Sequence, residues 1–306
     1  MNKKKFFVSM FVTFLVVIFV AGGLFAANFL FGTSLSDTIN SIFDRSKTGK
    51  INVLLLGVDK DKTRSDVMMV VSVDPDFNTI KVLSIPRDTR VKVNETKHDK
   101  INHSMGYKNP EEMVIKMVKQ VTGMPIHYYC EISFEGFRNI IDILGGVEFD
   151  VPVDMHYEDP AQDLYIHVNK GKQILNGKDA EGVVRFRKSY ATGDLGRINT
   201  QQDFLKALFE QKLQPQYIAK APSIIKEVYE HVKTNLSVAD ALKYVKMLKK
   251  MDANSLSVHM LPGNSKTISG VSYFIYDEAK TKQLVLEEFG YPEEEAKKLA
   301  TPETKK

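Results

Sequence analysis

The sequence is poor in two residue types that build common kinds of site. It has one cysteine, Cys130, which excludes an intrachain disulfide and a cysteine-rich zinc site. Because Cys130 lies in an apolar run, it is predicted to be a core residue rather than a nucleophile. Arginine is also scarce, with eight residues against 34 lysines. The formal charge of +4, from 42 basic and 38 acidic residues, indicates a mixed surface and does not favour a nucleic-acid-binding protein.

Several sequence signatures of catalysis are missing as well. The chain has no G-x-S-x-G nucleophile turn and no GxxxxGK(S/T) phosphate-binding loop. Its seven histidines show no close metal-ligand spacing, and no internal repeat or low-complexity segment is present. These absences argue against a serine hydrolase of the G-x-S-x-G type, a P-loop nucleotide-binding protein and a histidine-rich metal protein.

The few arginines are unevenly placed, since three short blocks beside Asp66, Asp88 and Asp194 contain Arg90 and five further arginines of the eight. Arginine is a flat, permanently charged fork that can hold two phosphate oxygens, whereas lysine is a point charge. A single Arg–Asp neighbour is usually a weak surface ion pair. Five arginines together favour a site for a multiply charged phosphate ligand, and they are Arg64, Arg87, Arg185, Arg187 and Arg197.

The N-terminus contains a long apolar segment, residues 6–31, without a charged side chain. This exceeds the roughly 20 residues that cross a bilayer as a helix. A cleaved signal peptide is the alternative, but a cut after Ala26 or Ala27 would leave Leu24 or Phe25 where a small residue is preferred. An uncleaved anchor is therefore expected.

The lysines at positions 3, 4 and 5 set the expected orientation of this anchor. By the positive-inside rule, residues 1–5 form a cytoplasmic tail and everything after the anchor is extracytoplasmic. Residues 32–50 are expected to be a stalk, 51–290 a single extracytoplasmic domain, and 291–306 a charged tail. The predicted localisation is the cell membrane, with a single pass and the C-terminal domain outside.

Beyond the stalk, strand signals alternate with helix signals. The turn DPDFN predicts a hairpin, and Asn109-Pro110 predicts a helix start that Gly123 ends. Residues 176–186 are expected to be helical or extended. We expect strands over 51–58, 67–73, 79–85, 128–132, 147–153, 256–261 and 271–275, and helices over 110–121, 134–144, 198–213, 223–232, 237–250 and 277–289. The predicted fold is α/β, with three layers (α/β/α) around a central mixed β-sheet, preceded by one transmembrane helix.

Charged residues follow the first and third predicted strands. Asp59 comes directly after the first strand and Asp66 directly precedes the second, so both are expected at the rim of the sheet, where α/β proteins place ligands. Two carboxylates there could hold Mg²⁺ together with phosphate oxygens and water. Pro86 ends the third strand and places Arg87 at the sheet edge. A solvated charged loop, and a structural Arg87–Asp88 turn, are the alternatives.

The third arginine block follows residue 183. If this stretch is extended, Arg185 and Arg187 project from one face while Val184 and Phe186 face the core. Arg197 is expected near the start of the next helix, with Gln201 one turn later, where the helix N-terminus favours an anion. Asp194 is expected in the turn before this helix.

Seven ordered blocks of the sequence resemble the LytR-CpsA-Psr proteins, over roughly residues 51–213. The blocks are NVLLLGVD, RSDVMMVVSVDP, VLSIPRDTRV, KINHSMGY, FRNIIDILGGVEFDVP, GKQILNGKDAEGVVRFR and GDLGRINTQQ. The resemblance implies an α/β/α fold and a phosphotransferase. Such an enzyme moves a glycopolymer, such as teichoic acid or capsular polysaccharide, from a polyprenyl-pyrophosphate carrier onto the 6-hydroxyl of N-acetylmuramic acid in peptidoglycan. It acts at the membrane with no nucleic-acid partner, and Mg²⁺, or alternatively Mn²⁺, assists.

The resemblance also assigns roles to particular residues. Asp59 and Asp66 correspond to the metal-associated carboxylates. Our own hypothesis, separate from the resemblance, is that Asp66 or Asp88 accepts the proton of the acceptor hydroxyl. In the sequence, Asp194 lies between Arg187 and Arg197. It is grouped with Asp66, Arg87 and Asp88 as a catalytic residue. The residues matched to pyrophosphate binding are Arg64, Arg87, Lys100, Arg185, Arg187, Arg197 and Gln201.

The sequence departs from the family pattern at Thr200, where an arginine is common before the paired glutamines. One fewer cation is expected to weaken the grip on pyrophosphate or to shift polymer preference. Two other functions stay open at this point. One is a non-catalytic binder or sensor of phosphorylated wall lipids, and the other is a polyprenyl-pyrophosphate hydrolase.

Overall fold

The computed structural model describes residues 50–59, 61, 63–94, 97–160, 164–187, 194–212, 228–237, 240, 244 and 255–291. These residues divide into two compact units. The sheet unit comprises the described residues up to 131, together with 234–236 and 257–291. The helical unit comprises those of 132–233 and 237–256.

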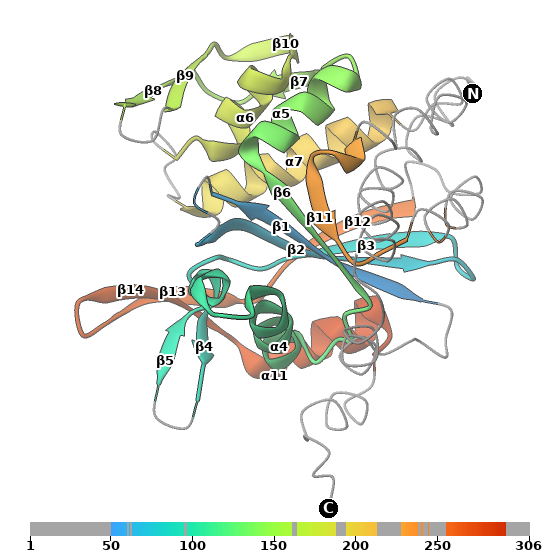
Figure 1. Ribbon diagram of the computed structural model, residues 1–306, viewed down its shortest axis with the longest axis vertical. Helices are drawn as coiled ribbons and strands as arrows, with labels where there is room; N and C mark the ends of the chain where they lie inside the picture. Colours follow the sequence, from blue (N-terminus) through green and yellow to red (C-terminus); the bar gives the residue numbers. More distant parts are fainter. Residues whose placement is uncertain are drawn as a thin grey trace, which may run out of the picture. The chain divides into compact units, whose positions relative to one another are not determined.

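A six-stranded sheet forms the centre of the fold, in the order β11-β6-β1-β2-β3-β12 (Figure 1). Strands β1, β2 and β3 are antiparallel neighbours, and the turn between β2 and β3 is the hairpin that the sequence predicts. The expected strands are confirmed with small shifts at their ends, whereas β11 was not predicted and begins at the last residue of the helix expected over 223–232. The bounds are β1 Ile51–Val58, β2 Ser65–Asp74, β3 Thr79–Ser84, β6 Tyr128–Ser133, β11 Val232–Thr234 and β12 Leu256–Met260.

Helix α4 (Pro110–Thr122) covers the core of the sheet unit. Proline at the first helical position needs no hydrogen-bonded N–H, and Gly123 ends the helix with a φ of 68°, a left-handed conformation that glycine adopts easily. Val114, Val118 and Val121 recur at helical spacing and are buried. They pack in one apolar cluster with Leu54 and Leu56 of β1. The apolar periodicity of 110–121 therefore predicted this layer correctly.

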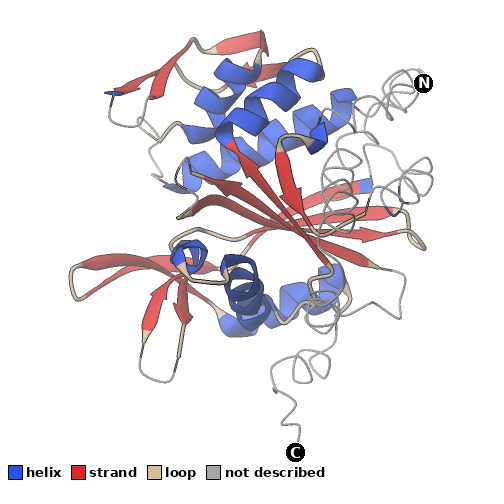
Figure 2. Cartoon of the chain, viewed as in Figure 1, coloured by secondary structure: helices blue, strands red, loops and turns tan. Residues whose placement is uncertain are grey.

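Short two-stranded ribbons lie outside the sheet (Figure 2). In the sheet unit, β4 (Arg90–Lys92) pairs with β5 (His98–Lys100), and β13 (Gly263–Ile268) pairs with β14 (Val271–Tyr276). A 3₁₀ helix, η1 (Ile101–Gly106), follows β5 directly. The C-terminal helix α11 (Glu278–Leu284) continues as a π-helical turn, η4 (Val285–Phe289), which confirms the helix expected over 277–289.

The helical unit contains α5 (Phe134–Ile143), α6 (Gly177–Arg185) and α7 (Asp194–Lys212). The side chain of Ser133 caps α5, and that of Asn176 caps α6. Phe204 of α7 contacts Phe137 of α5 and Phe149 of β7, with ring centroids 6.1 and 5.6 Å apart. The remaining strands are β7 (Val147–Val151) with β10 (Gly171–Leu175), and β8 (Met155–Asp159) with β9 (Leu164–Val168).

Several sequence expectations fall on residues that the structure does not describe. The anchor, nearly all of the stalk, and the C-terminal tail after residue 291 lie outside the described residues, as do most of the helices expected over 223–232 and 237–250. Among the residues that are described, no helix is long and apolar enough to cross a membrane. The three-layer arrangement involves helices of both units and stays a prediction.

Candidate functional site

Asp66 occupies an irregular position at the junction of β1 and β2. In the β1–β2 ladder, Gly57 pairs with Val67 and Val58 pairs with Ser65, so Asp66 is the extra residue of a β-bulge. A bulge turns the local side chain out of the regular alternation of a strand and is common beside active sites. The bulge therefore directs one carboxylate to the sheet end without changing the register of the rest of β2.

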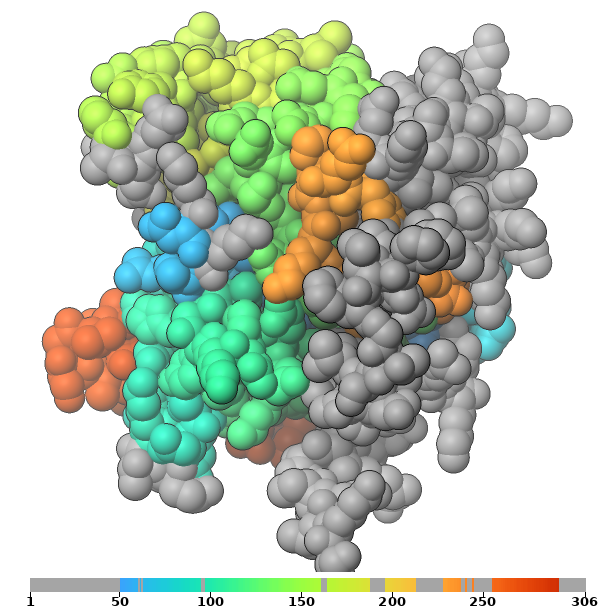
Figure 3. Space-filling model, in the orientation of Figure 1, coloured from blue at the N-terminus to red at the C-terminus, as the bar shows by residue number. Residues whose placement is uncertain are grey.

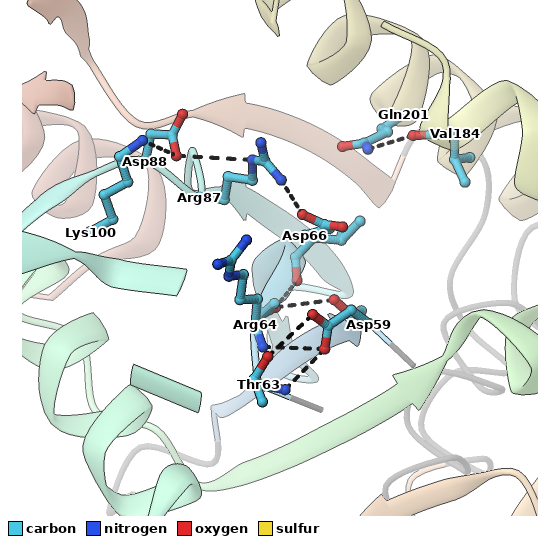
Figure 4. A network of polar contacts seen from close by, with 12 residues as sticks. Asp59, Thr63, Arg64, Asp66, Arg87, Asp88, Lys100, Val184 and Gln201 are labelled. Atoms are coloured by element: carbon cyan, nitrogen blue, oxygen red, sulfur yellow. Dashed lines mark hydrogen bonds and ion pairs between the residues drawn. The ribbon is translucent and has the colours of Figure 1, made fainter. Parts of the chain in front are cut away.

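The loop between β1 and β2 is organised by Asp59 (Figure 4). Its Oδ1 atom accepts hydrogen bonds from the backbone N–H groups of Thr63, at 2.9 Å, and Arg64, at 3.3 Å. Its own N–H donates to the carbonyl oxygen of Arg64, at 3.1 Å. Arg64 is exposed, and its guanidinium forms no hydrogen bond or ion pair within the described part of the chain. Asp59 thus shapes a loop that presents an uncompensated cation.

Arg87 and Asp66 form an ion pair between the end of β3 and the start of β2. Arg87 Nε lies 4.0 Å from Asp88 Oδ1, and the same carboxylate oxygen lies 3.1 Å from Lys100 Nζ. The four side chains are between 20% and 29% exposed, so solvent screens their charges only in part. The result is a chain of alternating charge, Asp66–Arg87–Asp88–Lys100, which is visible in Figure 4.

The backbone turn that places Arg87 begins at Pro86. The N–H and the hydroxyl of Thr89 both donate to the Pro86 carbonyl oxygen, at 2.9 and 2.6 Å. The Arg87 carbonyl oxygen accepts from the Asn102 N–H at 3.1 Å. The expected proline-directed exit of Arg87 at the sheet end is confirmed, and η1 anchors the turn from the other side.

The balance of charges among the predicted site residues of the sheet unit limits which ligands the site could bind. Three cations (Arg64, Arg87 and Lys100) accompany three carboxylates (Asp59, Asp66 and Asp88). The described residues contain no cluster of three or more His, Cys, Asp or Glu side chains suited to a metal. A cation such as Mg²⁺ fits here only if a ligand's phosphates supply further oxygens, which is how Mg²⁺ commonly binds. A phosphate ligand would in turn add negative charge to a balanced set, which a divalent cation would offset.

In the helical unit, Arg185 is the last residue of α6. Residues 176–186 were expected to be helical or extended, and the extended conformation considered for this stretch is excluded. Val184 and Phe186 are buried as expected, and Arg187 is exposed after the helix end. Arg185 is 14% exposed, and its guanidinium lies 4.0 Å from the centroid of the Phe134 ring. This stacked contact fixes the plane of the guanidinium.

Glu181 is a functional candidate that the sequence reasoning missed. Its carboxylate is 5% exposed, and its two oxygens bind Arg185 at 2.7 Å and Arg138 of α5 at 2.8 Å. The spacing of Glu181 and Arg185, four residues apart on a helix, was a signal that could have identified the pair. The contact to Arg138 depends on the packing of α5 against α6 and has no local signal.

Helix α7 begins at Asp194, so Arg197 lies near its start as expected, with Gln201 one turn later. The expectation that Asp194 precedes the helix in a turn is therefore wrong. Arg197 is 2% exposed and Gln201 is 7% exposed, and the Gln201 amide donates to the Val184 carbonyl oxygen at 2.7 Å. Thr200 is also buried, and its hydroxyl donates to the Gly196 carbonyl oxygen at 3.1 Å. An arginine in its place would have to be accommodated in this buried position.

The predicted site residues therefore fall into two sets, one in each unit. Within the sheet unit lie Asp59, Arg64, Asp66, Arg87, Asp88 and Lys100, and within the helical unit lie Arg185, Arg187, Arg197 and Gln201. That both sets serve one pocket stays a prediction. The roles assigned to these residues, and to Asp194, also stay predictions.

Cys130 is a buried core residue, as the sequence analysis expects. Cys130 is fully buried, and burial raises the pKa of its thiol, which disfavours the nucleophilic thiolate. His103 Nδ1 lies 2.7 Å from Asp99 Oδ1. Burial raises the pKa of Asp99, but hydrogen bonds from the Lys100 N–H and from His103 lower it overall. These contacts are structural and lie beside the charge chain.

The described residues thus define a mixed α/β protein in which arginines and carboxylates alternate at the end of a sheet, an arrangement suited to a phosphate-bearing ligand. The chain belongs to the LytR_cpsA_psr family, whose model matches residues 32–288. The resemblance carried by the seven sequence blocks is thereby confirmed.

Two relatives carry names that describe an activity. The polyisoprenyl-teichoic acid–peptidoglycan teichoic acid transferase TagU of Bacillus anthracis is 30% identical over 286 residues, which cover 88% of this chain and 91% of the relative. The polyisoprenyl-teichoic acid–peptidoglycan teichoic acid transferase TagV of Bacillus subtilis is 31% identical over 246 residues, which cover 75% of this chain and 63% of the relative.

Solved structures agree in fold. The crystal structure of B. subtilis TagV superposes with a TM-score of 0.67 at 29% identity, covering 84% of this chain and all of the TagV chain in that structure. TagT bound to LI-WTA superposes with a TM-score of 0.64 at 27% identity, covering 84% of this chain and 92% of TagT. The predicted mixed α/β fold with a central mixed sheet is therefore confirmed.

Proposed function

We propose that this protein is a transferase that moves a teichoic-acid-like glycopolymer from a polyprenyl-pyrophosphate carrier to peptidoglycan. Membership of the LytR_cpsA_psr family and the names of the TagU and TagV relatives support the class of reaction. The single observation that carries the assignment to a site is the charge chain Asp66–Arg87–Asp88–Lys100, next to the uncompensated Arg64.

In the proposed reaction, the acceptor hydroxyl attacks the phosphorus atom that carries the glycopolymer. A new P–O bond forms to the acceptor, and the bond to the carrier phosphate breaks, so that polyprenyl monophosphate leaves. The hydroxyl proton passes to a carboxylate, for which Asp66 and Asp88 are the candidates. Arg64 and Arg87 bind the pyrophosphate oxygens, where negative charge increases in the transition state.

The ion pairs give the cationic groups fixed positions before substrate binds. Asp66 holds the Arg87 guanidinium and Asp88 holds Lys100, so less side-chain freedom is lost when a phosphate arrives. In the helical unit, Glu181 holds Arg185 in the same way. Arg185, Arg187, Arg197 and Gln201 complete the proposed pyrophosphate-binding set, with Asp194 as a further acidic group.

Asp59 and Asp66 would hold Mg²⁺, or Mn²⁺, when the substrate's phosphates are present. A bound divalent cation supplies positive charge that stabilises the leaving phosphate. The equal numbers of cations and carboxylates among the site residues of the sheet unit support this part of the proposal. A pyrophosphate bound there without a metal ion would leave an excess of negative charge.

The proposed location is the outer face of the cell membrane. The uncharged segment 6–31 would anchor the chain, with the lysines at positions 3, 4 and 5 inside. An anchor would hold the site close to the bilayer, where a lipid-linked donor is concentrated. The proposed partners are thus the membrane, the lipid-linked polymer and peptidoglycan.

The test uses the full chain in lipid nanodiscs, with a labelled polyprenyl-pyrophosphate glycopolymer and peptidoglycan oligomers. Label is expected to become covalently bound to peptidoglycan. Arg87→Gln is expected to lower kcat/KM by about 100-fold. Lys172→Gln is the matched control, because Lys172 is an exposed lysine on β10, opposite Asp150 of β7, and is not among the predicted site residues.

Each alternative function has its own outcome in this assay. Undiminished transfer by Arg87→Gln would overturn the site assignment. Label that is released as free polymer phosphate, with acceptor present, would indicate a hydrolase. An Asp66→Asn protein that restores a deletion strain, while transferring nothing, would indicate a binder or sensor.

A further inference from the structure

Tyr273 of β14 lies between two cations of the β4–β5 ribbon. The guanidinium carbon of Arg90 is 5.8 Å from the centre of the Tyr273 ring, and Lys100 Nζ is 5.9 Å from it. On the hairpin itself, Lys266 of β13 stands opposite Tyr273 in the antiparallel ladder. We call these four residues, Arg90, Lys100, Lys266 and Tyr273, the cationic tyrosine cluster.

The arrangement of charge in this cluster is unfavourable for the protein alone. Arg90 and Lys100 are paired directly across the β4–β5 ladder, where like charges destabilise a strand pair. Lys100 has Asp88 as a carboxylate partner, at 3.1 Å. Arg90 and Lys266 have no carboxylate within 4.0 Å among the residues that the structure describes. Repelling cations that are kept together without counter-charges indicate an external anion.

The cluster is fixed relative to the charge chain of the candidate site. Lys100 belongs to both, and the Phe274 N–H donates to the Asp88 carbonyl oxygen at 2.9 Å. Thr89 and Phe274 form a parallel β-bridge between the same two segments. Figure 1 shows the β13–β14 hairpin beside β4 and β5, and Figure 3 shows it at the surface of the molecule.

We propose that the cationic tyrosine cluster is a subsite for the anionic repeat units of the transferred glycopolymer. This inference rests on the proposed function, because a polymer whose terminal pyrophosphate is bound at Arg64 and Arg87 must extend over the protein surface next to that site. The cations bind phosphodiester groups of the repeat, and the Tyr273 ring packs against the apolar face of a sugar or polyol.

The chemistry of the cluster favours the donor polymer over the peptidoglycan acceptor. Three cations share one carboxylate partner, Asp88, which suits a ligand with a phosphate in each repeat. Peptidoglycan has an uncharged sugar backbone and stem peptides that carry both signs of charge. A surface selected for those peptides would be expected to present carboxylates as well.

The test measures binding to the full chain in nanodiscs with soluble probes. Poly(glycerol phosphate) oligomers represent the anionic repeat, chitin oligosaccharides represent a neutral glycan, and inorganic pyrophosphate reports on the charge chain. Arg90→Gln and Lys266→Gln are each expected to weaken poly(glycerol phosphate) binding about three- to tenfold at low salt. Neither substitution should change pyrophosphate binding, and chitin oligosaccharides should bind weakly to every variant.

Two further variants separate charge from ring packing. Tyr273→Phe keeps the ring and is expected to bind poly(glycerol phosphate) like the wild type, whereas Tyr273→Ser is expected to bind it more weakly. Lys172→Gln, a lysine on another two-stranded ribbon, is the charge control and should bind normally. Unchanged affinity in both Arg90→Gln and Lys266→Gln would overturn the proposal. So would a selective loss of binding to soluble peptidoglycan fragments, which would assign the cluster to the acceptor.

Transfer kinetics distinguish this inference from the proposed function. With a donor that carries the full polymer, Arg90→Gln should raise KM with little change in kcat, and with a donor that lacks repeat units it should have no effect. If neither the wild type nor any variant transfers polymer, but Arg90→Gln and Lys266→Gln still weaken poly(glycerol phosphate) binding, the proposed function is wrong and the subsite is supported. If transfer is normal and the substitutions change neither binding nor KM, the subsite fails and the function stands.

Discussion

The carboxylate of Glu181 accepts from the guanidinium of Arg185, one helical turn later, at 2.7 Å. Glu181 is almost completely buried and also binds Arg138, so one carboxylate compensates two arginines on two helices. Removing a buried partner leaves the remaining charges without compensation, which costs more than the pair itself contributes.

Glu181→Gln is therefore expected to destabilise the protein and to misplace Arg185. Because Arg138 is 41% exposed, solvent reduces the effect, and the loss in free energy of unfolding is expected to be about 1–3 kcal/mol. Urea unfolding of the variant measures this loss. Glu148→Gln, at an exposed position of β7, is the control and should be neutral. Equal stability of the Glu181 variant would contradict the bridging role.

Asp59 has a structural role in its loop and a proposed metal role, and two substitutions separate them. Asp59→Asn keeps an oxygen that can accept from the Thr63 and Arg64 N–H groups, so its stability should be close to that of the wild type. Asp59→Ala loses those bonds and is expected to cost about 1 kcal/mol. Both variants should lose stimulation of transfer by Mg²⁺, measured as activity against Mg²⁺ concentration. Full Mg²⁺ stimulation of Asp59→Asn would exclude this carboxylate as a metal ligand.

Gly177 is required by the close approach of α6 to α5. A Cβ atom at this position would lie 2.2 Å from the carbonyl oxygen of Arg138, which is backbone and cannot rotate away. Gly177→Ala is expected to cost about 2–4 kcal/mol and to lower the midpoint of thermal unfolding. Gly106→Ala is the matched control, since its added carbon meets nothing nearer than 3.7 Å. Similar melting of the two variants would show that α5 and α6 can separate at little cost.

His259 is expected to make the stability of the protein depend on pH. Burial lowers the pKa of His259 below its ordinary value, and Lys81 lowers it further, while Glu288 opposes both. The folded state therefore binds this proton less tightly than the unfolded chain does. Stability is complete above the ordinary histidine pKa of about 6.5 and falls as the pH drops from there through the lowered pKa.

His259→Gln should remove this part of the pH dependence. Urea unfolding at about pH 5 and about pH 8 measures the difference in stability between the two conditions for each protein. The difference should be smaller for His259→Gln than for the wild type. His98→Gln, at an exposed position of β5, should leave it unchanged. An unchanged difference in His259→Gln would assign the pH dependence to other groups.

Elements with strong local signals were predictable from the sequence. The apolar run 51–58 gave β1 with its observed ends, and Pro110 and Gly123 marked the limits of α4. The β4–β5 and β8–β9 ribbons were not predicted, because short strands such as His98–Lys100 are polar and carry no periodic pattern. Their pairing depends on contacts between distant parts of the chain.

The site residues, like the strands and helices, were predictable where the signal is local and were missed where it depends on tertiary contacts. Asp59, Arg64 and Arg87 could be placed at strand ends because the strands themselves were evident. The burial of Arg197 could not be predicted, since an arginine at 2% exposure contradicts the usual surface preference of charged residues. The link from Glu181 to Arg138 also required the packing of two helices.

The bulge in β2 places the Asp66 carboxylate at the sheet end without giving this residue a partner in the β1–β2 pairing. Asp66 has no residue of β1 directly opposite it, so its side chain can be exchanged without shifting the pairing of the residues before and after it. Substitutions there should change reactivity while leaving the architecture intact. The carboxylate that pairs with Arg87 thus belongs to a residue whose replacement alters the site but not the pairing of β1 with β2.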